Sequence, residues 1–303
     1  MDDIILRKVK FQEAKEFAIL NNDNMAIVSL QKTPSFRDLI FFVYKDDIVI
    51  GLVILYGRYC PMDGLELQHV FLKEEYRKKG YYPIILKILM RILKKCFLRH
   101  LYLRIISSDQ NKMYEDFYFN MGFEVYDTAT IYKCNVNEES LSLWNKVKNN
   151  MLNRLVEWHK NNGVVTLSFD EADDKMLKLL KKQKTYSKNY NIKDVLNGVS
   201  GNFSKSTSFM SILDNKPVAI SMVLEATPTQ AVFQLISEDE NYAGTGVYLP
   251  AVYMSMESLF KSKYETVSFC IFEYNKHMEK DAKLLFSTLV SNIVVQKSLK
   301  IRL

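Results

Sequence analysis

The sequence predicts an α/β fold in which two similar domains, each built on a mixed sheet, are joined by a helix. Residues 1–136 alternate between short apolar runs of strand length and amphipathic stretches with a helical period. Residues 164–300 repeat this order of elements with little identity of residues. Between them, residues 138–160 carry an apolar stripe at three- and four-residue steps, which is typical of one long helix. A chain of 303 residues is long enough for two domains.

The first half contains the apolar runs of six strands and the periodic patterns of three helices. The expected strands are 3–10, 39–44, 48–56, 65–72, 101–106 and 124–136, and the expected helices are 11–20, 83–99 and 112–121. The polar turn Lys45-Asp46-Asp47 predicts a hairpin between the second and third strands. Pro83 suits the first turn of its helix, where the missing N–H has no partner to lose.

The second half follows the same plan. The expected strands are 164–168, 209–213, 217–225, 231–237 and 266–272, and the expected helices are 170–182, 192–196, 249–261 and 279–290. Asp214-Asn215-Lys216 is again a turn between two strands. We therefore expect one domain over residues 1–137, a connecting helix over 138–162 and a second domain over 163–303.

Composition excludes several classes of protein. Hydrophobic residues make up 48% and charged residues 25%, and 10 Gly with 6 Pro argue against a low-complexity chain. The four cysteines form no C-x-x-C and the four histidines no H-E-x-x-H, so we expect free thiols in a reducing compartment and no metal. Neither a signal peptide nor an apolar stretch of membrane-spanning length is found, so we expect a cytoplasmic protein with no membrane partner.

The net charge of +6 is concentrated in one segment. Residues 73–99 contain nine lysines and arginines, opposed only by Glu74 and Glu75. A local positive field of this kind suits a phosphate-bearing ligand. Nucleic acid is not the expected partner, because a domain that binds it usually has a broader basic face. The plain alternative is a solvated, lysine-rich helix face.

The segment Leu65–Pro83 combines a strand, a polar turn, a basic loop and the start of a helix. Backbone N–H groups at such a loop point at an anion, and the helix dipole adds a favourable field. Gly80 permits a close approach of the backbone to the ligand. The physics of this segment therefore suits a pyrophosphate.

Arg77-Lys78-Lys79-Gly80-Tyr81-Tyr82 resembles the cofactor signature of the GNAT superfamily of acyl-CoA-dependent N-acetyltransferases, Gln/Arg-x-x-Gly-x-Gly/Ala. Tyr82 departs from it, because the family has a small residue there. The resemblance implies two tandem GNAT-like domains and acetyl-CoA as co-substrate. The residues implied to bind it are Val70, Phe71 and Leu72 for the pantetheine arm and Arg77, Lys78, Lys79, Gly80, Tyr81 and Tyr82 for the pyrophosphate.

A second signature of the family follows about thirty residues later. Asn111 is followed by Phe117-Tyr118 and by Gly122-Phe123, in the family's order and spacing. The resemblance implies that Asn111 contacts pantetheine and that Tyr118 protonates the departing CoA thiolate. Core packing of an aromatic helix is the plain alternative for Tyr118.

The strand before the basic loop carries two candidates for the general base. Glu66 lies where several members of the family place a catalytic glutamate, and a carboxylate could take the ammonium proton directly or through water. His69 is the second candidate, but in a regular strand its side chain lies on the face opposite to Glu66. A surface role for Glu66 and a structural role for His69 are the alternatives.

The corresponding loop of the second half, Glu240–Val247, has Gly244 and Gly246 but no basic residue. Its acidic flank would repel a pyrophosphate. Asn275 follows the next strand, yet Ala282 stands where a tyrosine is expected. We therefore expect a degenerate GNAT-like domain that does not bind CoA.

Three functions fit these patterns. The first is transfer of an acetyl group from acetyl-CoA to a primary amine, in a small molecule or a peptide, by direct attack in a ternary complex. The second uses an acyl carrier protein as donor, and the third is a non-catalytic CoA-sensing or scaffold protein. We expect the acceptor to approach between residues 11–40 and the strand end near Tyr56, Arg58 and Tyr59. The acceptor, the acyl chain length and the oligomeric state stay open.

Overall fold

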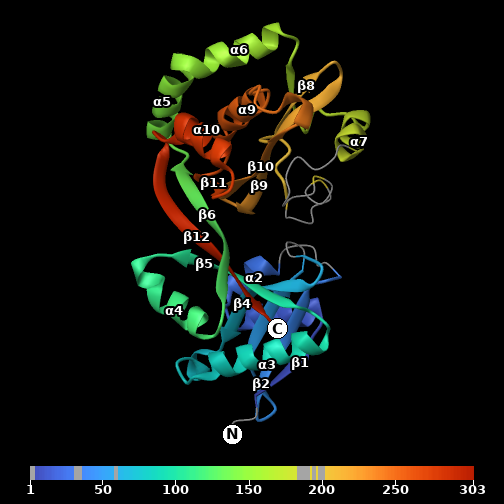
Figure 1. The fold of residues 1–303 in the computed structure, drawn as a ribbon, viewed down its shortest axis with the longest axis vertical. Coiled ribbons are helices and arrows are strands. Elements are labelled where there is room, and N and C mark those ends of the chain that lie inside the picture. The colour runs from blue at the N-terminus through green and yellow to red at the C-terminus, as the bar shows by residue number, and fades with distance from the viewer. Residues whose placement is uncertain (1–3, 31–35, 58–60, 183–191, 193–195, 197–201) are drawn as a thin grey trace. The chain divides into compact units, whose positions relative to one another are not determined.

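The computed structural model describes residues 4–30, 36–57, 61–182, 192, 196 and 202–303. The chain divides into two compact units (Figure 1): unit 1 comprises Met1–Thr128 with Gln296–Leu303, and unit 2 comprises Ala129–Val295. Both units combine helices with a mixed sheet, so the predicted fold class is confirmed. In the described part of the chain, no helix has the length and apolar character needed to span a membrane.

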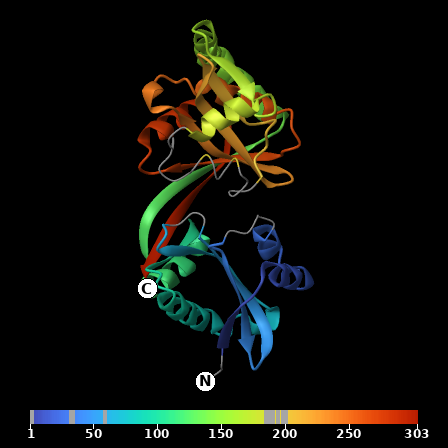
Figure 2. The same ribbon diagram turned by 90° about the vertical axis from the view of Figure 1, so that its right-hand side faces the viewer.

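Unit 1 has helices on both faces of its sheet (Figure 2). Its elements are β1 (Ile4–Lys8), α1 (Phe11–Leu20), α2 (Asn24–Ser29), β2 (Leu39–Lys45), β3 (Ile48–Tyr56), β4 (Gly64–Leu72), α3 (Tyr81–Lys95), β5 (His100–Ser107) and α4 (Lys112–Asn120). Strands β1 to β4 are antiparallel neighbours, and β4 pairs with β5 in parallel. α1 and α2 pack on one face, whereas α3 packs on the other.

Helix α3 shows why the sequence pattern predicts this layering. Ile85, Leu89 and Leu93 recur at helical spacing and are fully buried against the sheet. Lys87 and Arg91 lie between them in sequence and are exposed. The predicted helix is confirmed, although it begins two residues before Pro83 and ends at Lys95.

Unit 2 begins within a strand that is divided between the two units, and it continues with helices and further strands. Its elements are α5 (Glu138–Val147), a π-helical turn (Lys148–Leu152), α6 (Asn153–Asn161), β7 (Val165–Ser168), α7 (Asp174–Lys182), β8 (Phe209–Leu213), β9 (Lys216–Thr227), β10 (Gln230–Glu238), α9 (Leu249–Leu259), β11 (Thr266–Phe272) and α10 (Lys276–Phe286). The predicted long helix is confirmed, with the π-helical turn in its middle. Most of the predicted helix at 192–196 lies outside the described residues.

Two long strands are divided between the units. β6 (Glu124–Asn135) pairs antiparallel with β11 through Ala129–Asn135, and β12 (Val290–Arg302) lies next to β5. β6 and β12 are themselves neighbours, as Figure 1 shows. Each unit is therefore extended by a strand from the other half of the sequence. The compact units divide the chain at other places than the predicted boundaries, and β12 is a strand that the sequence analysis missed.

The C-terminal segment is anchored in unit 1. Leu299 is fully buried in the core beneath α3, and the Leu303 N–H donates to the Arg99 carbonyl at 2.8 Å. Lys297 Nζ lies 2.6 Å from the buried carboxylate of Glu115 on α4. The last residues of the chain are thus part of the core of the first unit.

Truncation of Leu299 tests this arrangement. We expect Leu299→Ala to lower the free energy of unfolding by about 2–5 kcal/mol, because it leaves a cavity in a closed core. The matched control is Ile293→Ala on the same strand, where the side chain is 58% exposed. Denaturant unfolding measures both, and equal small losses would contradict the assignment of residues 296–303 to unit 1.

The two units repeat in detail. The pairing of β3 with β4 skips Gln68 on β4, and the pairing of β9 with β10 skips Gln234 on β10. β4 and β10 therefore each carry a bulged glutamine. Immediately before each bulge, pairing with the next parallel strand ends. Counted from the two glutamines, the following features fall at the same positions: the 3₁₀ turns Glu74–Tyr76 and Glu240–Tyr242, and the left-handed Gly80 and Gly246. The predicted repeat of architecture is confirmed.

Candidate active site

Strand β4 opens away from β5 at the bulge. The two strands pair over Gly64–Leu67 and His100–Leu103, and their register ends there. On its other edge β4 stays paired with β3 as far as Leu72, which faces Gly51. In the described part of the chain, the β5-facing edge of Gln68–Leu72 therefore lies outside the sheet ladder. Backbone N–H and C=O groups on such an edge are available to a ligand.

The bulge also decides which way His69 points. Glu66 lies opposite Tyr56 and His69 opposite Ile54, and both partners belong to the core under α1 and α2. The prediction that Glu66 and His69 lie on opposite faces is therefore wrong. The extra residue Gln68 adds one step to the alternation and brings His69 onto the same face as Glu66.

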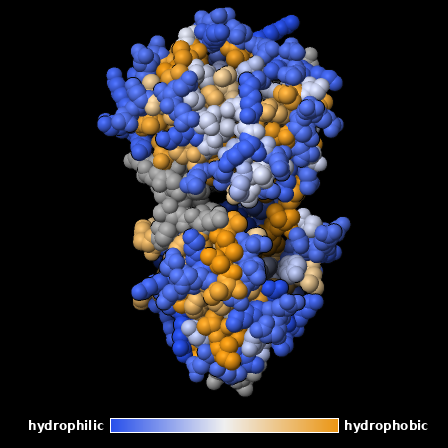
Figure 3. Space-filling view, turned by 180° about the vertical axis from the view of Figure 1, so that it is seen from behind, coloured by the Kyte–Doolittle hydropathy of each residue, from blue (hydrophilic) through white to orange (hydrophobic). Residues whose placement is uncertain are grey.

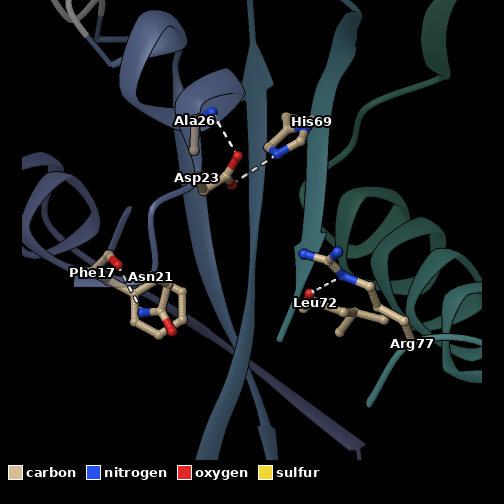
Figure 4. Close-up of polar contacts among 7 residues, drawn as sticks. All are labelled: Phe17, Asn21, Asp23, Ala26, His69, Leu72 and Arg77. Carbon is tan, nitrogen blue, oxygen red and sulfur yellow. Dashed lines mark hydrogen bonds and ion pairs between the residues drawn. The ribbon is translucent and has the colours of Figure 1, made fainter. Parts of the chain in front are cut away.

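His69 is paired with a buried aspartate (Figure 4). Asp23 precedes α2 as its N-cap, and its Oδ1 accepts the Ala26 N–H at 3.1 Å. Its Oδ2 lies 2.9 Å from His69 Nε2. The Asp23 side chain is 6% exposed and that of His69 is 20% exposed. The cap bond fixes the carboxylate, and the carboxylate fixes the imidazole.

Asp23 and His69 line a cavity of about 410 Å³. Its walls are Asn21–Met25, the β4 residues His69–Leu72, and Arg77. The predicted cofactor residues Val70, Phe71, Leu72 and Arg77 are thus brought together. Arg77 Nε donates to the Leu72 carbonyl at 2.8 Å (Figure 4). The Arg77 guanidinium lies 5.4 Å from the centre of the Phe71 ring.

The basic loop turns sharply into α3. Lys78 and Gly80 both have left-handed backbone, with φ of 58° and 77°. Lys78, Lys79 and Gly80 are exposed, and Tyr81 is buried as the first residue of the helix. The loop therefore presents positive side chains and a helix N-terminus to the solvent, as an anion site requires.

Gly80 can be tested by its backbone alone. A Cβ added there meets no atom within 4 Å, so only the positive φ opposes a larger residue. We expect Gly80→Ala to cost about 1–2 kcal/mol of stability, measured by denaturant unfolding. Gly57→Ala is a contrasting control, because its Cβ would lie 2.5 Å from the Arg37 Cβ at an ordinary φ. An unchanged stability in Gly80→Ala would contradict the loop conformation.

Tyr82 departs from the family pattern without pointing into the loop. Its ring packs 5.6 Å from that of Phe117 on α4, and its hydroxyl lies 2.5 Å from that of Tyr118. Burial and the neighbouring Tyr118 raise the pKa of Tyr82. Burial also raises the pKa of Tyr118, although the hydrogen bond from Tyr82 lowers it in part. Both phenols are therefore protonated at neutral pH.

Glu66 is held in an ion pair. Arg104 on β5 reaches it through two contacts, Nε to Oε1 and Nη2 to Oε2, both of 3.1 Å. The Glu66 side chain is only 6% exposed and does not line the cavity that contains His69. Because both carboxylate oxygens contact one guanidinium, this geometry suits a structural charge pair better than a proton acceptor.

Two other predicted residues, Asn111 and Tyr56, hold the backbone of unit 1 through their side chains. Asn111 precedes α4, and its Nδ2 donates to the Ile106 carbonyl at 3.0 Å, so it ties the helix to the end of β5. Tyr56 is buried, and its hydroxyl donates to the Ser29 carbonyl. Arg58 and Tyr59 lie outside the described residues. Among the residues that are described, no three His, Cys, Asp or Glu side chains come together as a metal site would need.

Apolar side chains lie beside the cavity. α1 and α2 lie on the face of unit 1 that Figure 3 turns toward the viewer. Part of this face is hydrophobic. The exposed apolar residues of these helices are Ile19, Leu20, Met25 and Val28. Met25 also lines the cavity. On this side of the cavity Met25 is thus an apolar residue beside the polar segment 21–24.

In the corresponding loop of unit 2, a backbone N–H already has a hydrogen-bond acceptor in the same unit. The Gly244 N–H donates to Glu238 Oε1 at 2.7 Å, where Glu238 is the last residue of β10. An amide that could bind a phosphate is thus occupied by a carboxylate of the same chain. This contact supports the prediction that unit 2 does not bind CoA.

Several solved structures are similar to this chain over nearly its whole length. A tandem GNAT protein from the clavulanic acid biosynthesis pathway superposes with a TM-score of 0.66, over 99% of this chain and 98% of its own, at 10% identity. The fold is a tandem GNAT fold. A GCN5-related N-acetyltransferase from Sphaerobacter thermophilus (TM-score 0.60, 9% identity, 99% of this chain and 95% of its own) also has it. A putative acetyltransferase from Pyrococcus horikoshii is similar too (TM-score 0.53, 12% identity, 99% and 89%).

No protein-family model matches the sequence, and no curated protein matches it. The similarity to solved structures is therefore a similarity of fold. It confirms the expected pair of GNAT-like domains. The sequence analysis missed Asp23, Arg104 and the contact of Tyr82 with Tyr118. A signal for Asp23 was present, because Asn21-Asn22-Asp23-Asn24 before an apolar run is typical of a helix N-cap.

Proposed function

We propose that this protein transfers an acetyl group from acetyl-CoA to a primary amine by direct attack in a ternary complex, with unit 1 as the catalytic unit. The observation that carries the proposal is the cavity of about 410 Å³. It joins the free edge of β4, the side chain that begins the basic loop, and a histidine–aspartate pair. The tandem GNAT fold supports an N-acyltransferase in general.

The donor would be held by the predicted cofactor residues. The backbone of Val70–Leu72, beyond the point where β4 leaves β5, would hold the pantetheine arm. Lys78 and Lys79 are exposed beside the N-terminus of α3 and would meet the pyrophosphate. For Asn111 and Tyr82, a contact with the donor is supported by the family resemblance alone. When bound, acetyl-CoA supplies the activated acetyl group.

His69 fits the role of general base better than Glu66. An ionised Asp23 can only accept, so the His69 nitrogen beside it, Nε2, carries the hydrogen. The other nitrogen, Nδ1, then has a free lone pair and can take a proton from the attacking amine. The charge that develops on the imidazole is stabilised by Asp23, 2.9 Å away. Glu66 would keep Arg104 and the β4–β5 pair in place.

Tyr118 fits the role of general acid. The thiolate that leaves the tetrahedral intermediate needs one proton. Tyr118 keeps its proton at neutral pH because burial raises its pKa. Its hydroxyl can give that proton to the sulfur, and the Tyr82 hydroxyl at 2.5 Å can stabilise the phenolate that remains.

An acyl carrier protein is the second candidate donor. It presents the same pantetheine arm on an acidic protein surface. Lys87, Arg91, Lys94 and Lys95 form an exposed basic face on α3 that complements such a surface. The cytoplasmic location also stays a prediction.

The function can be tested by product analysis. The wild-type chain is incubated with acetyl-CoA and a panel of primary amines, and both free CoA thiol and acylated product are followed. We expect CoA release that depends on the amine. A chain that binds acetyl-CoA and acylates none of the amines would contradict the enzyme and favour the CoA-sensing alternative.

A further inference from the structure

Unit 2 contains a pocket of its own at the place where its strands part. β10 and β11 pair over Gln230–Phe233 and Thr266–Phe269, and their register ends there. Beyond that point a cavity of about 330 Å³ opens between Gln234–Ile236 and Cys270–Phe272. Side chains of α9 and α10 close it. A volume of this size accommodates a small organic molecule.

The walls of this unit 2 pocket are mostly apolar. The aromatic and aliphatic residues are Phe233, Leu235, Ile236, Val252, Phe269, Ile271, Phe272, Leu285 and Phe286. Against them stands one carboxylate, Asp281, whose Oδ2 accepts the Tyr248 hydroxyl at 2.5 Å. No lysine or arginine occurs among the described residues that line it. The pocket thus combines an apolar body with a negative end.

A second carboxylate adds to the negative potential. Glu238 Oε2 is buried and has no hydrogen-bond partner among the residues that the structure describes. Burial raises the pKa of Glu238, the Gly244 N–H lowers it in part, and the charge of Asp281 raises it further. Burial raises the pKa of Tyr248, and Asp281 and Glu238 raise it further. A bound cation would offset the repulsion between these two carboxylates.

Comparison with unit 1 shows that, at matching positions, unit 2 lacks three positive charges and gains a negative one. Counted from the bulged glutamines, Arg77, Lys78 and Lys79 correspond to Ala243, Gly244 and Thr245, and Leu72 corresponds to Glu238. Tyr82 corresponds to Tyr248. In unit 1 this tyrosine contacts a phenol, and in unit 2 it contacts a carboxylate. The same scaffold that suits an anion in unit 1 therefore suits a cation in unit 2.

We propose that the unit 2 pocket binds a small organic amine in its ammonium form. Asp281 is the counter-ion, with Glu238 as a longer-range contributor, and the aromatic and aliphatic walls enclose the carbon body. This site does not depend on the activity of unit 1, because none of its residues belongs to the proposed catalytic cavity.

Binding to the full-length chain tests the proposal by calorimetric titration. The probes are 2-phenylethylamine and hexylamine, with 2-phenylethanol and hexanol as neutral counterparts and 3-phenylpropanoate as an anion. We expect saturable binding of at least one amine, at least tenfold tighter than its alcohol, and no saturable binding of the anion.

Variants locate the site. Asp281→Asn should weaken amine binding at least tenfold, whereas Asp214→Asn, the same change in an exposed turn, should leave it unaltered. Glu238→Gln should weaken it several-fold and serves if Asp281→Asn fails to fold, as thermal unfolding would show. Binding of amine and alcohol with equal affinity, no amine binding at millimolar concentration, or amine binding unchanged in both pocket variants would overturn the proposal. Loss of acyl transfer with intact amine binding would affect only the function of unit 1.

Discussion

His69→Gln is expected to lower kcat/KM for acyl transfer by roughly 10²–10⁴-fold, the range for loss of a positioned general base. Nδ1 of His69 is proposed to take the ammonium proton, and glutamine offers no basic nitrogen. Steady-state rates of the wild type and of His69→Gln measure this effect.

Two further variants separate the histidine from its neighbours. Asp23→Asn keeps a side-chain oxygen for the Ala26 N–H and removes the negative charge beside Nε2, so we expect roughly a 10–100-fold loss of kcat/KM. Glu66→Gln should lower activity far less than His69→Gln. If Glu66→Gln abolishes transfer while His69→Gln leaves it near normal, the assignment of the base to His69 fails.

Tyr118→Phe is the second substitution with a large expected effect, roughly 10²–10⁴-fold in kcat for loss of a general acid. Binding of acetyl-CoA should change little, because only one hydroxyl is removed. Burial raises the pKa of Tyr118, so its proton is present below that raised pKa and is lost only as the pH climbs through it. Wild-type kcat should therefore hold into the alkaline range.

Tyr82→Phe is the matched control for Tyr118→Phe. It removes the neighbouring hydroxyl, 2.5 Å away, and leaves the proton donor in place. Because the Tyr82 hydrogen bond lowers the pKa of Tyr118, its loss should move any alkaline limb of kcat upward. A loss of activity in Tyr82→Phe as large as that in Tyr118→Phe would contradict the assignment of the proton donor.

Local chemistry made the helices and hairpins of this fold predictable. The turn residues Asp46 and Asp47 have φ of 50° and 61°, and Asp214 and Asn215 have φ of 49° and 58°, as tight hairpins require. The apolar period of α3 and the basic loop before it were also readable. These features depend on neighbours in sequence.

Features that depend on distant contacts were not readable. Gln68 looks like any other residue of an alternating strand, and only its pairing with β3 reveals the bulge that turns His69 toward Asp23. α2 has six residues, too few to show a period. β12 has no regular alternation of apolar and polar residues, and its place beside β5 is fixed by long-range pairing. The candidate base was therefore visible as a residue, whereas its partner and direction required the structure.

Native mass spectrometry with acetyl-CoA tests the central claim most directly, namely that unit 1 alone holds the donor. We predict one acetyl-CoA per chain for the wild type, and none for an Arg77→Glu/Gly80→Trp variant, which reverses a charge and fills the loop. Lys95→Glu at the exposed far end of α3 should still bind one. Two acetyl-CoA per chain, or one that persists in the loop variant, would contradict the account. No binding in the wild type would contradict acetyl-CoA as donor and lead to the acyl carrier protein instead.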